Sequence, residues 1–461
     1  MALRGTYVLP HPPLAVHEVG RGEEKKIADT LKGYESVAED IAAKRPDTIV
    51  LFTPHSDAYA DYFHISSGKE GHGSFAQFGA PQVAFRQTYD ETLIASIEKT
   101  LRRQNIRGGT KGGQSSSLDH GTMVPLYFVN KHYKDYELVR ISISGLPLSK
   151  HYRFGQALQE AFEASRKDIV VVASGDLSHR LKKEGPYGYV EEGPRFDKKC
   201  VEALKNANFE ALLRMDSRVV NRAGECGLRP FVMMAGVLDK KSVKPIFHSY
   251  EGPFGVGYAT LSFEVGKKDD NRNFQETFNK EAKKKAQKRR EHESEPVKFA
   301  RKIVENLVLA RGDSEVSKED KQRLNFAHHG AFVTLKMHGV LRGCIGTSFP
   351  SKPTLAEEIA ANAKSAALHD PRFPPVEASE LPFLEYSVDV LKAPEVVENK
   401  DSLDPSRYGV LVENNGKTGL LLPDIEGVNT PEEQIQIALQ KAGISMNESY
   451  TIKRFEVERF F

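Results

Sequence analysis

The chain has 461 residues, more than the roughly 100–200 of a typical domain, so we expect two or three domains. Its 65 Lys and Arg side chains nearly balance 63 Asp and Glu, and the net charge of +2 favours neither nucleic acid nor a membrane surface. No apolar run reaches the ~20 residues that span a bilayer, and the first residues lack the apolar core of a signal peptide. Three cysteines without CxxC spacing favour a reducing compartment, so we expect a cytoplasmic protein.

Three short apolar runs, each bounded by turn-forming residues, precede His11, His55 and His179. Such runs are typical of buried strands, and open α/β sheets bind ligands just beyond the ends of their strands. Apolar residues at helical spacing over 23–44 predict a helix that joins the first two strands into a βαβ unit with parallel strands. We therefore expect His11 and His55 at the same edge of a sheet.

The alternation of strands and helices continues to residue 265. Strands are predicted over 137–144 and 169–173, and a strand pair lies within 245–263. Helices are predicted over 89–104, 152–165, 195–215 and 231–238, and another begins near His120. Residues 1–265 are thus predicted to form one α/β domain.

A charged segment separates this domain from the rest of the chain. Residues 266–296 carry many Lys and Arg and almost no apolar side chains, so they cannot bury a core and are predicted to be a linker or an exposed helix. Residues 297–461 again alternate helices, such as 299–310 and 354–368, with strands such as 330–335. This pattern predicts a second domain of the α/β or α+β class.

A metal site is the function that these histidines indicate. Two histidines and one carboxylate suit iron(II) when open positions are left for oxygen or a substrate. His11 and His55, with Glu225 from a tight turn before a helix, supply this set. A single histidine beside a proline is more often a surface or core residue, but its recurrence at several strand ends strengthens the metal hypothesis.

Two further histidines are candidates for catalysis. His179 follows Asp176 and Ser178, which can orient its ring or tune its pKa, and a free imidazole near a metal suits general acid–base chemistry. His120 follows Asp119 and can hydrogen-bond a substrate or oxygen species. The simpler interpretations are an incidental histidine after a helix cap at 174–176 and a turn histidine satisfied by Asp119.

Several motifs occur in an order that resembles one known superfamily. They are Pro10-His11-Pro-Pro, Thr53-Pro-His55-Ser, Asp119-His120-Gly, Gly175-Asp-Leu-Ser-His179 and Gly224-Glu-Cys-Gly227. Their order resembles class III extradiol dioxygenases, which include protocatechuate dioxygenase catalytic subunits and the related MEMO proteins. The resemblance implies a mixed sheet flanked by helices and iron(II) held by two histidines and a glutamate. It gives His11 and His55 as ligands, His179 as the acid–base residue and His120 as a second active-site histidine.

The third ligand has more than one candidate. Glu225 supplies the carboxylate of the dioxygenases, and we favour it because a hard carboxylate suits iron(II). In MEMO-like relatives a cysteine of a Cys-Gly turn occupies this region, and Cys226 matches it. Glu251 is a more remote option.

The second half resembles another family. Leu341-Arg-Gly-Cys-Ile-Gly-Thr347 and Asp370-Pro-Arg-Phe-Pro-Pro375 are similar to the signature of AMMECR proteins, which implies an α+β domain over 297–461. Arg342 offers a bidentate anion contact and Cys344 a nucleophile. Free cysteine is commonly a small buried hydrophobe, so a ligand-binding or partner-binding surface is the favoured role.

The expected function combines these resemblances. The first domain is predicted to be an iron(II)-dependent extradiol-type dioxygenase that takes dioxygen and a catechol-like or aminophenol-like aromatic. Chains that join the two domains resemble a group named for association with radical S-adenosylmethionine proteins, which implies such a partner. The alternatives are a MEMO-like module that binds metal or peptide without ring cleavage, and a metal-dependent hydrolase that works without oxygen.

Overall fold

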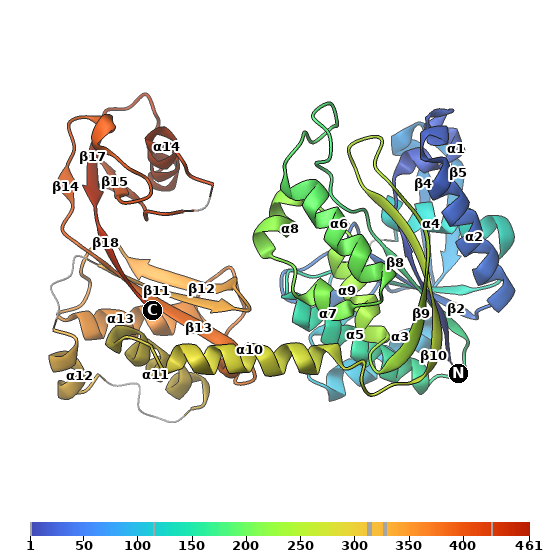
Figure 1. Ribbon diagram of the computed structural model, residues 1–461, viewed down its shortest axis with the longest axis horizontal. Helices are drawn as coiled ribbons and strands as arrows, with labels where there is room; N and C mark the ends of the chain where they lie inside the picture. Colours follow the sequence, from blue (N-terminus) through green and yellow to red (C-terminus); the bar gives the residue numbers. More distant parts are fainter. Residues whose placement is uncertain (1, 114–115, 311–315, 326–329, 426) are drawn as a thin grey trace. The chain divides into compact units, whose positions relative to one another are not determined.

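The protein is described from a computed structural model over residues 2–113, 116–310, 316–325, 330–425 and 427–461 (Figure 1). The chain divides into two compact units, Met1–Phe278 and Asn279–Phe461, here called unit 1 and unit 2. Each unit has its own hydrophobic core. In the described part of the chain, no helix is both long and apolar enough to cross a membrane.

Unit 1 is built on a six-stranded mixed sheet with the order β7-β2-β8-β1-β10-β9. The four strands from β7 to β1 are parallel, β10 is antiparallel to β1, and β9 is antiparallel to β10. The expected mixed sheet is thereby confirmed. In chain order the strands are β1 (Leu3–Leu9), β2 (Thr48–Thr53), β7 (Glu137–Ser142), β8 (Ile169–Ser174), β9 (Lys241–Glu251) and β10 (Tyr258–Lys268).

The central strands are apolar along their whole length because both of their faces are covered. Every residue of β2 and β8 is buried, as expected for parallel strands with helices on both sides. Strand β8 lies between β2 and β1. Because these three strands are parallel, the segments that follow them, with His11, His55 and His179, emerge at one edge of the sheet.

Helices cover both faces of this sheet (Figure 1). Helix α2 packs against α4, and α5 packs against α3 and α9. The predicted helix over 195–215 is divided in two, because the Asn208 side chain caps a new helix by accepting from Ala211 N at 3.3 Å. The helices of unit 1 are α1 (His17–Gly20), α2 (Ala28–Lys44), α3 (Glu91–Arg103), α4 (His120–His132), α5 (Leu148–Glu163), α6 (Glu192–Lys205), α7 (Phe209–Leu213), α8 (Ser217–Ala223) and α9 (Leu228–Val237).

Shorter elements complete unit 1. Strands β4 and β5 form an antiparallel pair, and β3 pairs with β6. Their bounds are β3 (Phe63–His64), β4 (Glu70–Phe75), β5 (Ala80–Thr88) and β6 (Gly108–Gly109), with 3-10 helices at Pro13–Ala15, Glu23–Ile27 and Ala76–Phe78.

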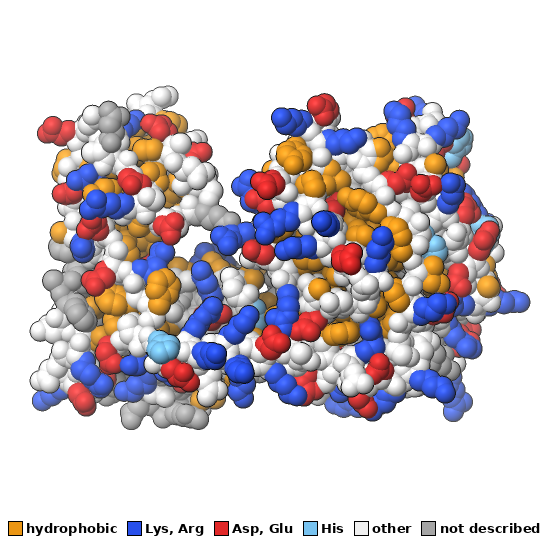
Figure 2. All heavy atoms as spheres, viewed as in Figure 1, with side chains coloured by type: hydrophobic (Ala, Val, Ile, Leu, Met, Phe, Trp, Pro, Cys, Tyr) orange, Lys and Arg blue, Asp and Glu red, His pale blue; other side chains and the backbone are white. Residues whose placement is uncertain are grey.

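The charged segment contains a regular helix, α10 (Phe274–Arg290). Lys and Arg side chains lie along the length of this helix and are blue in Figure 2. Phe278 and Ala286 are its buried apolar residues. Of the two forms expected for this segment, the structure therefore has the helix.

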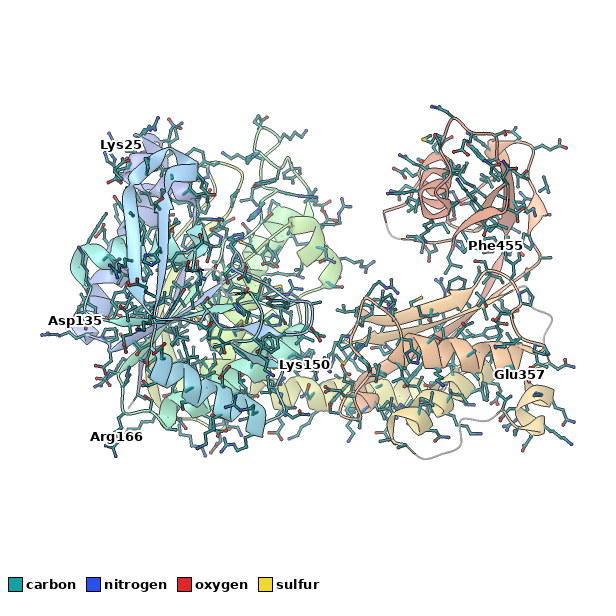
Figure 3. All side chains as sticks on the ribbon, turned by 180° about the vertical axis from the view of Figure 1, so that it is seen from behind. Lys25, Asp135, Lys150, Arg166, Glu357 and Phe455 are labelled. Carbon is teal, nitrogen blue, oxygen red and sulfur yellow. The ribbon has the colours of Figure 1, made fainter. Side chains whose placement is uncertain are left out.

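Unit 2 contains two four-stranded sheets, ordered β12-β11-β13-β18 and β14-β17-β15-β16. Helices α11 and α13 pack on the first sheet, and α14 packs on the second. Phe455, labelled in Figure 3, belongs to β17 and shares a small core with Leu391 and Leu411. The strands are β11 (Ala331–Met337), β12 (Val340–Thr347), β13 (Leu384–Leu391), β14 (Glu395–Val396), β15 (Gly409–Asn414), β16 (Lys417–Leu421), β17 (Thr451–Phe455) and β18 (Val457–Phe460), and the helices are α11 (Glu295–Val308), α12 (Lys318–Arg323), α13 (Leu355–Leu368) and α14 (Pro431–Ala442), with 3-10 helices at Leu381–Phe383 and Lys400–Ser402.

A single glycine allows α2 to lie against β10. A Cβ atom on Gly33 would lie 2.1 Å from Thr260 Oγ1 and 2.8 Å from Thr260 Cβ. Gly33→Ala should therefore destabilise unit 1 by about 1–3 kcal/mol through overpacking, although alanine favours helices by about 1 kcal/mol. Urea unfolding followed by far-UV circular dichroism measures the effect. Ser36→Ala, on the exposed side of the same helix, is the control, and a stabilised Gly33 variant would contradict the close packing.

Candidate metal centre

Three ligand atoms meet at the edge of the sheet. Nε2 of His11 and Nε2 of His55 are 3.0 Å apart, and Cys226 Sγ is 3.3 Å from His11 Nε2. The three ligand atoms all lie within 4.8 Å of one another. Within the described residues, this is the one group of three or more His, Cys, Asp and Glu side chains that could hold a metal ion.

A hydrogen-bond chain fixes the tautomer of His11. Ser174 Oγ donates its proton to Gly121 O at 2.5 Å, so this hydroxyl can only accept from His11 Nδ1, 2.9 Å away. The ring proton therefore resides on Nδ1, and the lone pair of Nε2 faces His55 and Cys226. Burial lowers the pKa of His11 to about 3, so its ring is neutral at physiological pH. A neutral ring with this orientation is ready to bind a metal.

Two glycines bring Cys226 to the histidines. A Cβ atom on Gly175 would lie 2.2 Å from Gly227 Cα, so the turn before α9 can contact the end of β8 only because side chains are absent there. Asp176 N then donates to Cys226 Sγ at 3.3 Å. Burial, followed by the nearby Asp176 and Glu225 carboxylates, raises the pKa of the Cys226 thiol well above its ordinary value. A bound cation would reverse this effect and favour the thiolate.

The structure brings Cys226, and not the favoured Glu225, to the two histidines. Glu225 Oε2 accepts from Leu228 N at 2.6 Å and so caps the N-terminus of α9. Burial raises the pKa of Glu225 to about 7. Glu251 is engaged at the start of α2, where its Oε2 accepts from Thr30 N at 2.6 Å and Thr30 Oγ1 at 2.7 Å. Neither carboxylate belongs to the group of ligand atoms.

His120 lies against both histidine ligands. It is the first residue of α4, and the preceding Asp119 caps this helix by accepting from Thr122 N at 3.0 Å. Its ring stacks on His55 with centroids 4.3 Å apart and meets His11 edge-on at 5.3 Å. Burial lowers its pKa, opposed by Asp119 and Asp176, which favours a neutral ring. The structure therefore places His120 beside the centre, as expected.

His179 is a partly buried histidine with an unused nitrogen. Its Nε2 atom is buried and has no hydrogen-bond partner among the described residues. The ring lies 5.3 Å from that of Tyr187, between centroids. Burial lowers the pKa of His179, while Asp176 acts in the opposite direction. An unpaired imidazole at this position can exchange a proton with a bound molecule.

Asp176 has one contact that its sequence position did not predict, because its carboxylate Oδ1 accepts from the backbone N–H of His11 at 2.7 Å. The expected effect on the pKa of His179 is present, since the Asp176 carboxylate opposes the lowering of that pKa by burial. Burial raises the pKa of Asp176 to about 6. Sequence reasoning missed Ser174 and the contact between Asp176 and His11, although the polar Ser174-Gly-Asp176 at the end of a buried strand was a signal for both.

A cavity of about 730 Å³ opens over the centre. His11, His55, Asp176, His120 and His179 contribute to its polar lining. Lys182 and Glu184 add opposite charges from an exposed loop. The remaining lining residues are mostly apolar: Pro12, Pro13, Leu14, Gly185, Pro186, Tyr187, Pro253, Phe254, Val256 and Tyr258. A largely apolar cavity with a few convergent polar groups is typical of a site for a small molecule.

The candidate residues of unit 2 are engaged with their neighbours. Arg342 is buried, and its Nε and Nη2 atoms donate to the two carboxylate oxygens of Glu380 at 3.0 and 2.9 Å. The expected bidentate contact is therefore made to a protein carboxylate. Cys344 Sγ lies 3.2 Å from Thr334 Oγ1, and Cys344 N donates to Asp370 Oδ2 at 2.9 Å. The two residues thus form part of the internal hydrogen bonding of unit 2.

Fold and site define a two-domain protein whose first domain is a mixed α/β sheet with a candidate His/His/Cys metal centre. Residues 5–261 match the family described as the catalytic LigB subunit of aromatic ring-opening dioxygenase, and residues 297–460 match AMMECR1. The chain belongs to the LigB family and carries a C-terminal AMMECR1 domain. The expected fusion of an extradiol dioxygenase-like domain with an AMMECR domain is thus confirmed.

Relatives share one or both parts of this chain. A protein of Clostridium acetobutylicum is 42% identical over 100% of this chain and 99% of its own length. A protein of Thermotoga maritima is 49% identical over 36% of this chain and 95% of its own length. The crystal structure of an uncharacterized protein from Pyrococcus horikoshii has 32% identity, a TM-score of 0.32, and covers 36% of this chain and 88% of that one.

Loss of the Ser174 hydroxyl should weaken metal binding. Ser174→Ala leaves the His11 ring without the partner that holds its proton on Nδ1, and such outer-shell changes reduce metal affinity by about 10–100-fold. Competition with a chelator measures the affinity. Ser142→Ala, at the end of β7, which β2 separates from β8, is the matched control. Equal affinities of the Ser174 variant and the wild type would contradict the role of this hydrogen bond.

The two candidates for the third ligand predict opposite results. Cys226→Ser should lower metal affinity by at least ~100-fold, more than an outer-shell change, because a thiolate ligand is lost. Glu225→Gln should keep the metal, since an amide oxygen can still cap α9. Elemental analysis of anaerobically purified variants measures metal content, with the His11→Ala, His55→Ala double variant as the metal-free reference. Loss of metal from the glutamine variant alone would restore Glu225 as the ligand.

Proposed function

We propose that unit 1 holds one transition-metal ion through His11, His55 and Cys226 and opens the ring of a catechol-like or aminophenol-like aromatic in an extradiol-type reaction with dioxygen. Membership of the LigB family supports this proposal, because that family includes ring-opening dioxygenases and its members are typically metal-dependent. The cavity supports it too, since apolar walls around a polar floor suit a flat aromatic with ring hydroxyls.

The residues present fit a single metal ion. Two ligands held at about 2.0–2.3 Å from one ion and roughly at right angles are about 3 Å apart. The separations of 3.0 Å between the two histidine nitrogens and 3.3 Å between sulfur and nitrogen agree with this arrangement. Iron(II), which the family implies, would be held here by two imidazoles and a thiolate. Non-haem iron(II) oxygenases commonly use two imidazoles and a carboxylate.

The observation that carries the proposal is the free Nε2 of His179. A buried polar atom without a partner is costly, so it persists where a ligand or a reaction uses it. His179 lines the same cavity as His11 and His55 but does not belong to the ligand group. Its Nε2 atom is therefore available to exchange a proton with a molecule bound in the cavity.

The side chains divide the chemistry between them. A metal held by His11, His55 and Cys226 would supply a Lewis acid for a ring oxygen of the substrate and a centre that activates dioxygen. His179 Nε2 accepts the proton of a ring hydroxyl and later returns it. His120, whose ring stacks on that of His55, can donate a hydrogen bond to a bound substrate or oxygen species. The apolar walls, which include Phe254 and Val256, exclude water from these steps.

One observation favours a second function, a metal-binding module without ring cleavage. Thiolate donors select softer metals such as copper or zinc, and Cys226 stands where iron(II) oxygenases commonly use a carboxylate. In that case the cavity would bind a metal or a peptide, and unit 2 would recruit the partner. The radical S-adenosylmethionine partner stays a prediction under both functions.

Removal of the free imidazole should separate catalysis from metal binding. His179→Ala should keep the metal but lower turnover by about 10²–10⁴-fold, the usual contribution of a general acid–base residue. Oxygen uptake with catechol and 2-aminophenol by anaerobically iron-loaded protein measures turnover. His132→Ala, an exposed histidine on α4 that pairs with Glu35, is the control. Unchanged turnover would exclude the role of His179, and absence of oxygen uptake by the metal-loaded wild type would favour the metal-binding module.

A further inference from the structure

Asp176 connects two of the three ligands and also faces the cavity. Its Oδ1 accepts from His11 N at 2.7 Å, and its own backbone N donates to Cys226 Sγ at 3.3 Å. The residue is only 6% exposed, and it lines the cavity over the centre. Its position is therefore fixed relative to both ligands by two independent hydrogen bonds.

The second carboxylate oxygen has no donor in the protein. Oδ2 of Asp176 lies 4.0 Å from His11 Nε2, beyond hydrogen-bond distance, and the Ser174 contact shows that Nε2 carries no proton. No hydrogen bond to Oδ2 joins it to any other described residue. This oxygen is open to the cavity, so a bound molecule that supplies a donor here can hydrogen-bond to it and gain affinity.

The other polar groups of the lining cannot take this place. Lys182 and Glu184 are exposed on the loop after β8, and Lys182 Nζ already donates to Pro253 O at 2.9 Å. His179 and His120 present imidazoles, which can accept only through one neutral nitrogen. Among the carboxylates that line the cavity, Asp176 is thus the one that is buried beside the metal ligands.

We propose that Asp176 determines specificity by accepting a hydrogen bond through Oδ2 from an O–H or N–H group of the bound aromatic. This inference rests on the proposed substrate class, an aromatic that binds the metal through a ring oxygen. The site then selects compounds with a hydroxyl or amino group ortho to that oxygen. It discriminates against the corresponding methyl ether, which has no proton to donate.

The test measures binding without turnover. Zinc is loaded into the purified full-length protein, because it has no redox chemistry and suits imidazole and thiolate ligands. Isothermal titration calorimetry then gives dissociation constants for catechol, 2-aminophenol and 2-methoxyphenol. The wild type should bind the first two at least about tenfold more tightly than the third, as expected for a hydrogen bond to a charged acceptor.

Asp176→Asn should abolish this preference. Its amide oxygen can still accept from His11 N, which leaves the NH₂ group facing the cavity as a donor toward the ether oxygen of 2-methoxyphenol. Zinc content is measured in parallel and should be unchanged. Glu39→Gln, which removes one exposed carboxylate on α2, is the control and should keep the preference.

Each outcome decides the inference. Equal binding of catechol and 2-methoxyphenol by the wild type overturns it, even if the asparagine variant cannot be obtained. A preference that persists in Asp176→Asn also overturns it, as does loss of zinc from that variant, which would make Asp176 purely structural. A zinc protein with the expected preference whose iron form takes up no oxygen would keep this inference and contradict ring cleavage.

Discussion

The candidate centre depends on the hydrogen-bond chain that runs from Gly121 O through Ser174 Oγ to His11 Nδ1. The chain holds the ring proton of His11 away from the cavity, so the lone pair of Nε2 is directed at His55 and Cys226. Ser174 is the last residue of β8, the strand between those that lead to His11 and His55. The next residue, Gly175, has no side chain and so leaves room for the turn that carries Cys226. Asp176 then accepts a hydrogen bond from the backbone N–H of His11. Three consecutive residues thus assemble a centre whose first and last ligands, His11 and Cys226, are 215 residues apart in the chain.

Much of this arrangement could be predicted from the sequence. Apolar runs marked the strands, and the parallel βαβ rule placed His11 and His55 at one edge of the sheet. A helix was expected to begin near His120, and α4 begins at this residue. These predictions succeeded because each depends on local sequence patterns or on a general rule of topology.

The third ligand could not be predicted in the same way. Glu225 and Cys226 are adjacent, and the side chain that reaches the histidines depends on the contact between Gly175 and Gly227, about 50 residues apart along the chain. Chemical preference for a carboxylate pointed to Glu225, whereas the open N-terminus of α9 had a competing need for it as a cap. The contact of Asp176 with His11 has the same origin, since it requires β1 and β8 to be neighbours. In unit 2, the bidentate use of Arg342 was foreseen, but its partner Glu380 comes from a segment that local patterns do not connect with it.

The cavity is bounded by the ends of buried strands on one side and by an exposed loop on another. Residues at the ends of buried, mutually hydrogen-bonded strands form the bottom of the cavity. The metal-ligand side chains there are already held in place, so they lose little conformational entropy when a metal binds. Part of its rim is the exposed loop of Lys182 to Tyr187, with Tyr187 59% exposed. Exposed loops rearrange at a far smaller energetic cost than buried strands. We therefore expect the strand ends to determine how tightly a molecule is held, and the loop to determine how quickly it enters and leaves.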